Sequence, residues 1–408
     1  MNTPSPFGFV AVLILCSAVA SAQAEVIGVA FERGVDQEAV ALLPVRGGLP
    51  LLLQRSFLEP RKARINPQRA ASDTLHVLDP TSGKSVPVVS YKADAPLWIG
   101  PAQAVADGVV FPVRTAADAP VIYKFAAADR TVRRLPLPWE RNGADAKPQQ
   151  YERLFVLVDA VIGVRSEMGV YQAEVWVGDA RAAVRLDTMI NNGDGRVIAI
   201  DDVAEVDGRV MLLMLVAAGQ GSDRAEVWLL SFDRSYTRAN ARAIRLETGS
   251  FSSGKVQFVR SSQGVSGVRV TQRTATYGRP TLKLFSVAGG TPIWSHELPR
   301  LLGADEVAIV GVCRRSFLMM RGSEDDKLRS IEVESVVLGP AGQEAVIDRV
   351  RMPQGTSVLR SVALAHKDKV WSYINFSRLE SERRADGWYS WRGFQGSADS
   401  ADRYCKFE

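Results

Sequence analysis

The sequence predicts an all-β fold, because short apolar segments with alternating polarity recur along the chain between tight turns. Long stretches with the 3.6-residue periodicity of an amphipathic helix are missing from the sequence. The recurrence is even, at about fifty residues, which is the length of one four-stranded blade. Together these observations predict a β-propeller of four-stranded antiparallel blades, with seven blades favoured and six or eight as alternatives.

The first recurring marker is a tight turn followed by a strongly apolar strand. Several turns contain Asp-Gly or Gly-Gly, which supply the positive φ angles that two-residue hairpins require. A seventh turn is expected near Asp159, inside the apolar run 154–164. The other turns and strands are 46–48 before 49–53, 107–108 before 109–113, 207–208 before 210–216, 263–264 before 265–270, 314–315 before 316–320 and 367–369 before 370–376.

The second marker is an alternating strand after each turn. The tetrapeptide Ala-Glu-Val-Trp occurs at 173–176 and again 52 positions later, and each copy leads to a related tail, at 183–188 and 243–248. Matching tails and spacing indicate a true repeat. The seven strands of this kind are 74–78, 121–125, 173–176, 225–228, 281–285, 330–333 and, least clearly, 388–391.

Even spacing also bears on how the strands assemble. A radial arrangement leaves only short, protected edges, whereas an open sheet of this size would aggregate. A pair of packed β-sandwiches is the alternative, and it would account for the strands but not for their spacing. We therefore expect residues 25–408 to form a single propeller domain.

The first 24 residues have the features of a secretion signal. An apolar run at 7–20 carries no charged side chain and ends in Ala20-Ser21-Ala22-Gln23-Ala24, which contains two overlapping A-x-A sites. The run is too short for a membrane span of about twenty residues. We expect cleavage before Glu25, a periplasmic or secreted location, and no transmembrane segment in the mature chain. The alternative is a buried N-terminal strand; a lipoprotein anchor at Cys16 is excluded, because Leu15 stands where a small residue is needed.

Two expected outer hairpins resemble a known repeat. Residues 77–84, which include Gly83, and residues 288–295, which include Trp294, are similar to the D-x-x-T-G-K-x-x-W signature of quinoprotein-like propellers. The first has Pro87 at the Trp position, and the second has Gly289 and Thr291 in place of Thr and Lys. The resemblance implies that the glycine forms the turn and that the tryptophan packs between blades. The quinone-binding and metal-binding residues of that family have no match here, so no cofactor is expected.

Catalytic and metal-binding motifs are missing from the sequence. The only three histidines are His76, His296 and His366, too far apart for a zinc-binding pattern. The segment 249–255 has the wrong spacing for a phosphate loop and is interpreted as a Ser/Gly turn. Residues 191–196 with Asp201 resemble part of a calcium loop, but Ile190 occupies the first ligand position, so a plain Asn/Gly hairpin is favoured. No metal site is therefore expected.

Charge and aromatic content leave the ligand open. The net charge of +5 favours contact with anionic envelope polymers, but the arginines are scattered, and 61–64 is interpreted as a solvated loop. Nucleic-acid binding would need a concentrated basic face and is excluded. The C-terminal aromatics could stack on sugar rings, although packing of the last blade is favoured. They are Trp371, Tyr373, Phe376, Trp388, Tyr389, Trp391, Phe394, Tyr404 and Phe407.

The sequence therefore favours an exported, non-catalytic binding or scaffold module that uses a propeller face or channel. Its partner would be a protein, peptide or glycan of the cell envelope. The alternative is a carbohydrate-active hydrolase or lyase with carboxylates in the channel, although paired carboxylates cannot be identified from the sequence.

The cysteines give the most specific prediction. Removal of the signal takes away Cys16 and leaves Cys313 and Cys405, an even number in a chain expected in an oxidising compartment. A bridge between them would tie the C-terminal tail to the sixth blade. The alternative is two unrelated buried thiols.

Overall fold

The computed structural model describes the parts of the chain from which the architecture is read. They are residues 25–28, 36–57, 72–80, 82–92, 95, 97–115, 119–141, 151–167, 170–177, 180–185, 196–219, 224–233, 241–249, 256–261, 264–273, 280–297, 308–313, 315–325, 330–351, 356–366, 369–378, 388–395, 405 and 407. Residues 1–24 and the segment 61–64 lie outside the described residues.

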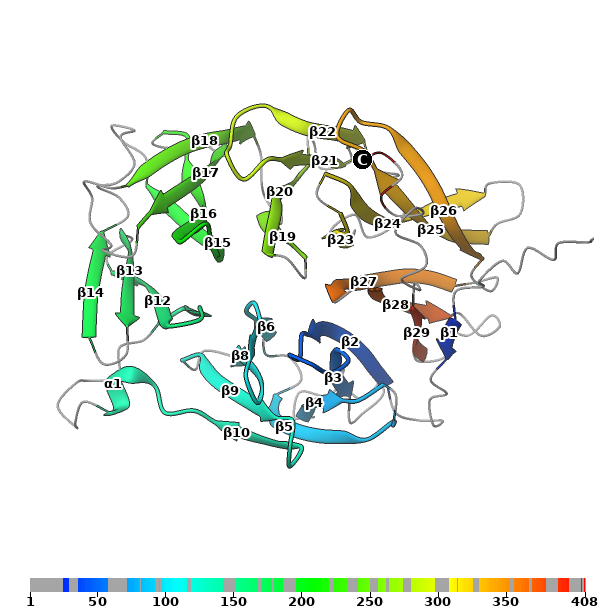
Figure 1. Ribbon diagram of the computed structural model, residues 1–408, viewed down its shortest axis with the longest axis horizontal. Helices are drawn as coiled ribbons and strands as arrows, with labels where there is room; N and C mark the ends of the chain where they lie inside the picture. Colours follow the sequence, from blue (N-terminus) through cyan, green and yellow to red (C-terminus); the bar gives the residue numbers. More distant parts are fainter. Residues whose placement is uncertain are drawn as a thin grey trace, which may run out of the picture.

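Within these residues the strands form seven antiparallel sheets arranged around a ring (Figure 1). We number them blades 1 to 7 along the chain. The architecture is a β-propeller, as the sequence predicts, and the seven sheets match the favoured number.

The first four blades are built from consecutive segments. Blade 1 contains β2 (Asp36–Leu43), β3 (Leu51–Phe57), β4 (Ser72–Leu78) and β5 (Ser85–Lys92). Blade 2 contains β6 (Leu97–Ile99), β7 (Gln103–Val105), β8 (Gly108–Thr115), β9 (Val121–Ala126) and β10 (Thr131–Arg134), followed by the short helix α1 (Pro138–Arg141). Blade 3 contains β11 (Arg153–Val156), β12 (Ala160–Glu167), β13 (Val170–Val177) and β14 (Ala180–Arg185). Blade 4 contains β15 (Val197–Val206), β16 (Arg209–Ala217), β17 (Ala225–Phe232) and β18 (Arg242–Gly249).

The last three blades complete the ring. Blade 5 contains β19 (Val256–Ser261), β20 (Gly264–Arg273), β21 (Pro280–Phe285) and β22 (Pro292–Glu297). Blade 6 contains β23 (Ala308–Gly311), β24 (Phe317–Asp325), β25 (Ser330–Leu338) and β26 (Glu344–Arg351). Blade 7 contains β27 (Thr356–His366), β28 (Lys369–Arg378), β29 (Trp388–Gln395) and, from the other end of the chain, β1 (Glu25–Gly28).

Both sequence markers occupy equivalent places in every blade. The turns of the first marker join the first strand of a blade to the second, and the strands of the second marker form the third strand, from β4 to β29. At one such turn, Asp207 and Gly208 have φ angles of 50° and 72°, the left-handed conformation that a two-residue hairpin needs. The repeat inferred from the sequence is therefore the structural repeat.

The hydrophobic core lies in the gaps between blades. Among the described residues, buried apolar side chains form seven clusters, one in each gap between neighbouring blades. Strand β16 shows how alternation supplies two clusters at once: Leu212 and Met214 face blade 3, whereas Leu213 and Leu215 face blade 5. The first strands of the blades lie toward the middle of the ring (Figure 1).

The two ends of the ring meet at the gap between blades 7 and 1. There Trp371 and Tyr373 of β28 pack against Leu52 and Leu78 of blade 1. The ring is also fastened by β1, which pairs with β29 in the register Glu25↔Gln395. Residues from both ends of the sequence thus form one sheet.

Blade 2 departs from the regular pattern in its first strand. Pro112 of β8 has no N–H, so a continuous neighbouring strand cannot complete its hydrogen bonds there. The inner edge is split into β6 and β7, and between them the Gly100 N–H donates to the Pro112 carbonyl over 3.0 Å. Gly100 sits so closely between Pro112 and Trp98 that an added Cβ would lie 2.5 and 2.7 Å from them.

The outer hairpins behave as the quinoprotein-like resemblance implies. Gly83 adopts a φ of 66° in the turn between β4 and β5, and its N–H donates to the Asp79 carbonyl over 2.9 Å. Trp294 of β22 is buried in the gap between blades 5 and 6, against residues such as Ile309 and Met319. Both the turn glycine and the packing tryptophan are therefore present.

Candidate functional site at the inner strands

A β-bulge in the inner strand of blade 4 places polar groups inside an otherwise apolar strand. The register of β15 on β16 shifts between Ile200 and Asp202, so Asp201 is the extra residue. Ile200 consequently stays in the core against blade 3, while Asp201 also faces that blade. Asp202 points to the other side, toward blade 5.

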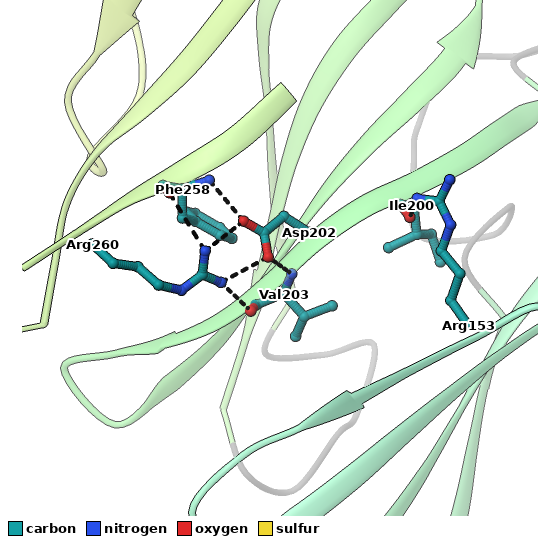
Figure 2. A network of polar contacts seen from close by, with 6 residues as sticks. All are labelled: Arg153, Ile200, Asp202, Val203, Phe258 and Arg260. Carbon is teal, nitrogen blue, oxygen red and sulfur yellow. Dashed lines mark hydrogen bonds and ion pairs between the residues drawn. The ribbon is translucent and has the colours of Figure 1, made fainter. Parts of the chain in front are cut away.

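Asp202 is held by a dense set of hydrogen bonds, shown in Figure 2. Nη1 and Nη2 of Arg260, on β19 of blade 5, each donate to a different Asp202 oxygen over 2.7 Å. The backbone N–H groups of Phe258 and Val203 donate to the same carboxylate over 2.8 Å. Arg260 Nη2 also donates to the Val203 carbonyl over 2.9 Å. This bidentate pair joins the inner strands of blades 4 and 5.

Arg153 makes the corresponding link between blades 3 and 4. Its Nη1 donates to the Ile200 carbonyl and lies 3.1 Å from Asp201 Oδ1. Its Cζ lies 5.9 Å from the centroid of the Trp98 ring, which belongs to blade 2, so three blades meet at this side chain. Burial raises the pKa of Asp201 above its usual range, and the positive charge of Arg153 opposes that shift.

A tyrosine and a second carboxylate lie beside this pair. Tyr171 of β13 is hydrogen-bonded to Glu152, whose backbone carbonyl accepts a hydrogen bond of 2.7 Å from Arg114. Burial and the negative charge of Glu152 raise the pKa of the Tyr171 hydroxyl, and the charges of Arg153 and Arg196 lower it. We call Trp98, Glu152, Arg153, Tyr171, Arg196 and Asp201 the Arg153 cluster.

The position of the Arg153 cluster follows from the direction of the strands. Strand β11 runs from Arg153 into the turn at 157–159, and β15 runs from Val197 into the turn at Asp207. Residues at the starts of these strands therefore lie at the end of the ring opposite these hairpin turns. Trp98, Arg153 and Arg196 lie toward this end of the inner strands of blades 2, 3 and 4, and Asp201 lies midway along β15, where it pairs with Arg153.

The two adjacent carboxylates pair with arginines on opposite sides of β15. The Asp201 and Asp202 carboxylates each form an ion pair with an arginine of a neighbouring blade, at 3.1 and 2.7 Å. Because these arginines belong to different neighbouring blades, Asp201 and Asp202 tie blade 4 to blades 3 and 5 and do not face one another. Arg153 and Asp201 remain partly accessible, with side-chain exposures of 30% and 17%.

The predicted cysteine pair is confirmed. Cys313, in the turn between β23 and β24, forms a disulfide with Cys405, and their Cα atoms are 5.6 Å apart. Nearby, Phe407 packs against Gly339 and the apolar cluster between blades 6 and 7. The C-terminal end is thereby fixed to blade 6.

The structure does not bring the three histidines together. His76 lies on β4 of blade 1 and His296 on β22 of blade 5, where its Nδ1 is 3.5 Å from Glu344. His366, at the end of β27, forms a 2.9 Å hydrogen bond with the Gly48 carbonyl of blade 1. In the described part of the chain, no group of three or more His, Cys, Asp or Glu side chains could hold a metal ion.

The structure describes only part of two further candidates, the calcium-like segment and the C-terminal aromatic residues. Residues 190–195 of the calcium-like segment lie outside the described residues, and Asp201 is paired with Arg153. Of the C-terminal aromatics, Trp371 and Tyr373 are buried between blades, which is the packing role. The side chains of the others, except Phe407, lie outside the described residues.

Sequence analysis did not single out Arg153, Asp202 or Arg260. A signal was present, because two adjacent acids, Asp201 and Asp202, interrupt the apolar run 197–204. Buried acids in such a strand need a cationic partner, and the partner can come from a neighbouring blade. The sequence does not reveal which arginine it is.

Comparison with known proteins finds only distant structural similarities. No protein-family model and no curated protein matches this chain. Similar solved structures include the WD40 domain of SCAP from fission yeast, at 9% identity and a TM-score of 0.43, covering 85% of this chain and 82% of that one. Trypanosoma rangeli sialidase has 9% identity and a TM-score of 0.43, and Chaetomium thermophilum Raptor has the same values. They cover 88% and 90% of this chain, which spans 55% of the sialidase chain and 29% of the Raptor chain. Similarities at this level carry no argument about function.

A last structural finding concerns helices that could span a membrane. In the described residues, no helix is both long enough and apolar enough to cross a membrane.

Proposed function

We propose that this chain is an exported, non-catalytic binding module that holds its ligand at the Arg153 cluster. The observation that carries the proposal is the convergence of partly exposed aromatic, cationic and acidic side chains from three blades at one end of the ring. The cluster is preorganised, because Arg153 is fixed by the Ile200 carbonyl and the Trp98 ring.

Export is the second part of the proposal. It is supported by the signal-like residues 1–24 and by the disulfide between Cys313 and Cys405, a bond that persists in oxidising compartments. Sequencing the N-terminus of the chain recovered from the periplasm or medium of its source organism should give Glu25 first. Recovery of an intact chain from the cytoplasm would contradict export.

A photo-crosslinking amino acid tests the binding site. Placed at position 171, it should crosslink a ligand in the native envelope, whereas the same group at Ser90, on the outer strand β5, should not. Equal crosslinking from both positions, or crosslinking from Ser90 alone, would contradict a site at the Arg153 cluster.

A carbohydrate-active hydrolase or lyase is the second candidate, and the raised pKa of Asp201 favours it. A carboxyl group with a raised pKa can act as a general acid. If the chain were such an enzyme, crosslinked or added glycan would be shortened by the wild type and not by Asp201→Asn. The binding module leaves the ligand intact in both cases.

A further inference from the structure

The Arg153 guanidinium is only partly used by the protein. Nη1 is engaged by the Ile200 carbonyl and Asp201, but among the described residues Nε and Nη2 donate no hydrogen bond. The side chain is 30% exposed, and the Trp98 ring lies 5.9 Å from Cζ. A fixed guanidinium with a free donor edge matches the planar geometry of a carboxylate.

The neighbouring charges select among anions. Arg196 is exposed, and its charge acts on Tyr171 together with that of Arg153, so both cations serve the same region. Asp201 and Glu152 lie in the region too. The two acids offset the charge of the two arginines, so the cluster has no excess positive charge that would favour a doubly charged phosphate monoester over a singly charged carboxylate.

Hydrogen-bond acceptors beside the arginine point to a sugar. The carboxylates of Glu152 and Asp201 can accept hydrogen bonds from sugar hydroxyls, and Trp98 and Tyr171 offer apolar ring surface. An acidic peptide supplies few side-chain hydrogen-bond donors for these two acids, whereas each sugar residue of a glycan supplies several hydroxyls. The chemistry of the Arg153 cluster therefore fits a glycan better than a peptide.

We infer that the Arg153 cluster binds a glycan that carries carboxylate groups, with a sugar carboxylate on the free donor edge of Arg153. This inference rests on the proposed binding function and names the ligand class. The two acids hold the hydroxyls of the same sugar or its neighbour, and Arg196 adds to the attraction.

Titration calorimetry of the mature chain with trigalacturonic acid tests the inference. The acid should bind at least about tenfold more tightly than its methyl ester, in which the carboxylate is masked, and more tightly than neutral galactotriose. Arg153→Met should weaken binding by at least about tenfold. The matched control is Arg134→Met, which removes an exposed arginine of β10 and should leave binding unchanged.

A second variant separates ligand binding from folding, because Arg153 also ties two blades together. Arg196→Gln leaves the contacts of Arg153 with Ile200 and Asp201 intact, and it should weaken binding of the acid and reduce its salt dependence. The thermal midpoint of each variant is measured in parallel.

Several results would overturn the inference. They are equal affinity for the acid and its ester, tighter binding of a triglutamate peptide, equal loss in the Arg134 control, or no binding of the acid by the folded wild type. If crosslinking from position 171 persists in that last case, the binding module stands and only the ligand class is wrong. If the acid does not bind and position 171 gives no crosslink either, the proposed binding site is wrong as well.

Discussion

At the scale of single residues, Asp202 illustrates how a buried charge becomes a structural link. Its side chain is 4% exposed, and it accepts four hydrogen bonds, two of them from Arg260. Substituting Asp202→Ala removes the carboxylate from Arg260, which keeps only backbone carbonyls as acceptors, and from two backbone N–H groups. We expect a loss of about 3 kcal/mol in the free energy of unfolding, the lower end for a broken buried pair because Arg260 is 32% exposed.

The control for this prediction is an exposed pair on the rim. Arg134 and Glu140 form an ion pair with side-chain exposures of 55% and 37%. Arg134→Ala should change the free energy of unfolding by less than about 1 kcal/mol. Chemical denaturation of both variants measures the difference, and similar losses would contradict the special role of Asp202.

His76, also a single residue, makes the stability of the folded chain depend on pH. It is half-buried on β4 between Gln54 and Pro87 of the adjacent strands, and burial lowers its pKa below 6.5. Below pH 6.5 the unfolded chain takes up the proton more readily than the folded one, so stability falls as the pH falls through the folded-state pKa.

The His76→Gln variant isolates this contribution. Its thermal midpoint should fall less than that of the wild type between about pH 8 and 5, because the titrating group is gone. Identical pH dependence of the two proteins would show that His76 does not carry the effect.

At the scale of elements, β1 supplies the outermost strand of blade 7. It begins at the predicted cleavage site and pairs with β29 from Glu25↔Gln395 to Gly28↔Arg392. Deleting residues 25–28 removes these hydrogen bonds and leaves β29 as an open edge. We expect the free energy of unfolding to fall by about 2–4 kcal/mol, because a few hydrogen bonds are lost and each contributes roughly 1 kcal/mol net.

Hydrogen exchange locates the effect of that deletion. The amides of β29 that face β1 should lose protection, while those of β13, in blade 3, should keep theirs. Unchanged protection in β29 would mean that β1 does not hold the edge. Since β1 begins at Glu25, the predicted cleavage site is also the latest one that preserves the whole strand.

Much of the element pattern is predictable because it depends on local chemistry. Turn residues such as Asp207-Gly208 set the hairpins, and period-2 alternation sets which side chains enter the gaps between blades. The split inner strand of blade 2 does not follow from alternation, although its cause, Pro112, is present in the sequence. The effect of a proline on a neighbouring strand appears only when the pairing is known.

The Arg153 cluster was harder to foresee than the strands. Its members come from blades 2, 3 and 4, and the bulge at Asp201 decides which neighbour that carboxylate meets. Alternation alone does not predict a bulge, and no spacing rule links Trp98 to Arg153. The disulfide was predictable because only two cysteines lie outside the predicted signal.

At the scale of the whole molecule, the disulfide between Cys313 and Cys405 closes a loop with a sequence separation of 92. Chain-entropy models assign a loop of this length up to about 4–5 kcal/mol. The thermal midpoint of the wild type should therefore fall on addition of a reductant, and that of Cys405→Ser should start low and not respond. A reductant effect of equal size in both proteins would assign it to something other than the bridge.

Closure of the ring also depends on the whole molecule, because blades 7 and 1 come from opposite ends of the sequence. A chain that ends before Lys367 lacks β28 and β29, so β1 loses its partner and the gap between blades 7 and 1 loses Trp371 and Tyr373. The apolar side chains that these residues cover, including Leu52 and Leu78, would face water. We expect loss of cooperative unfolding in calorimetry and strong binding of a hydrophobic dye.

The full-length Cys405→Ser variant is the control for this truncation, because the shortened chain also lacks the disulfide. If the missing bridge were the whole cause, both proteins would unfold alike. A shortened chain that melts in one sharp transition near the midpoint of that control would contradict the closed ring. Each blade buries its two faces against two neighbours, so removing strands from one blade uncovers the blades on either side.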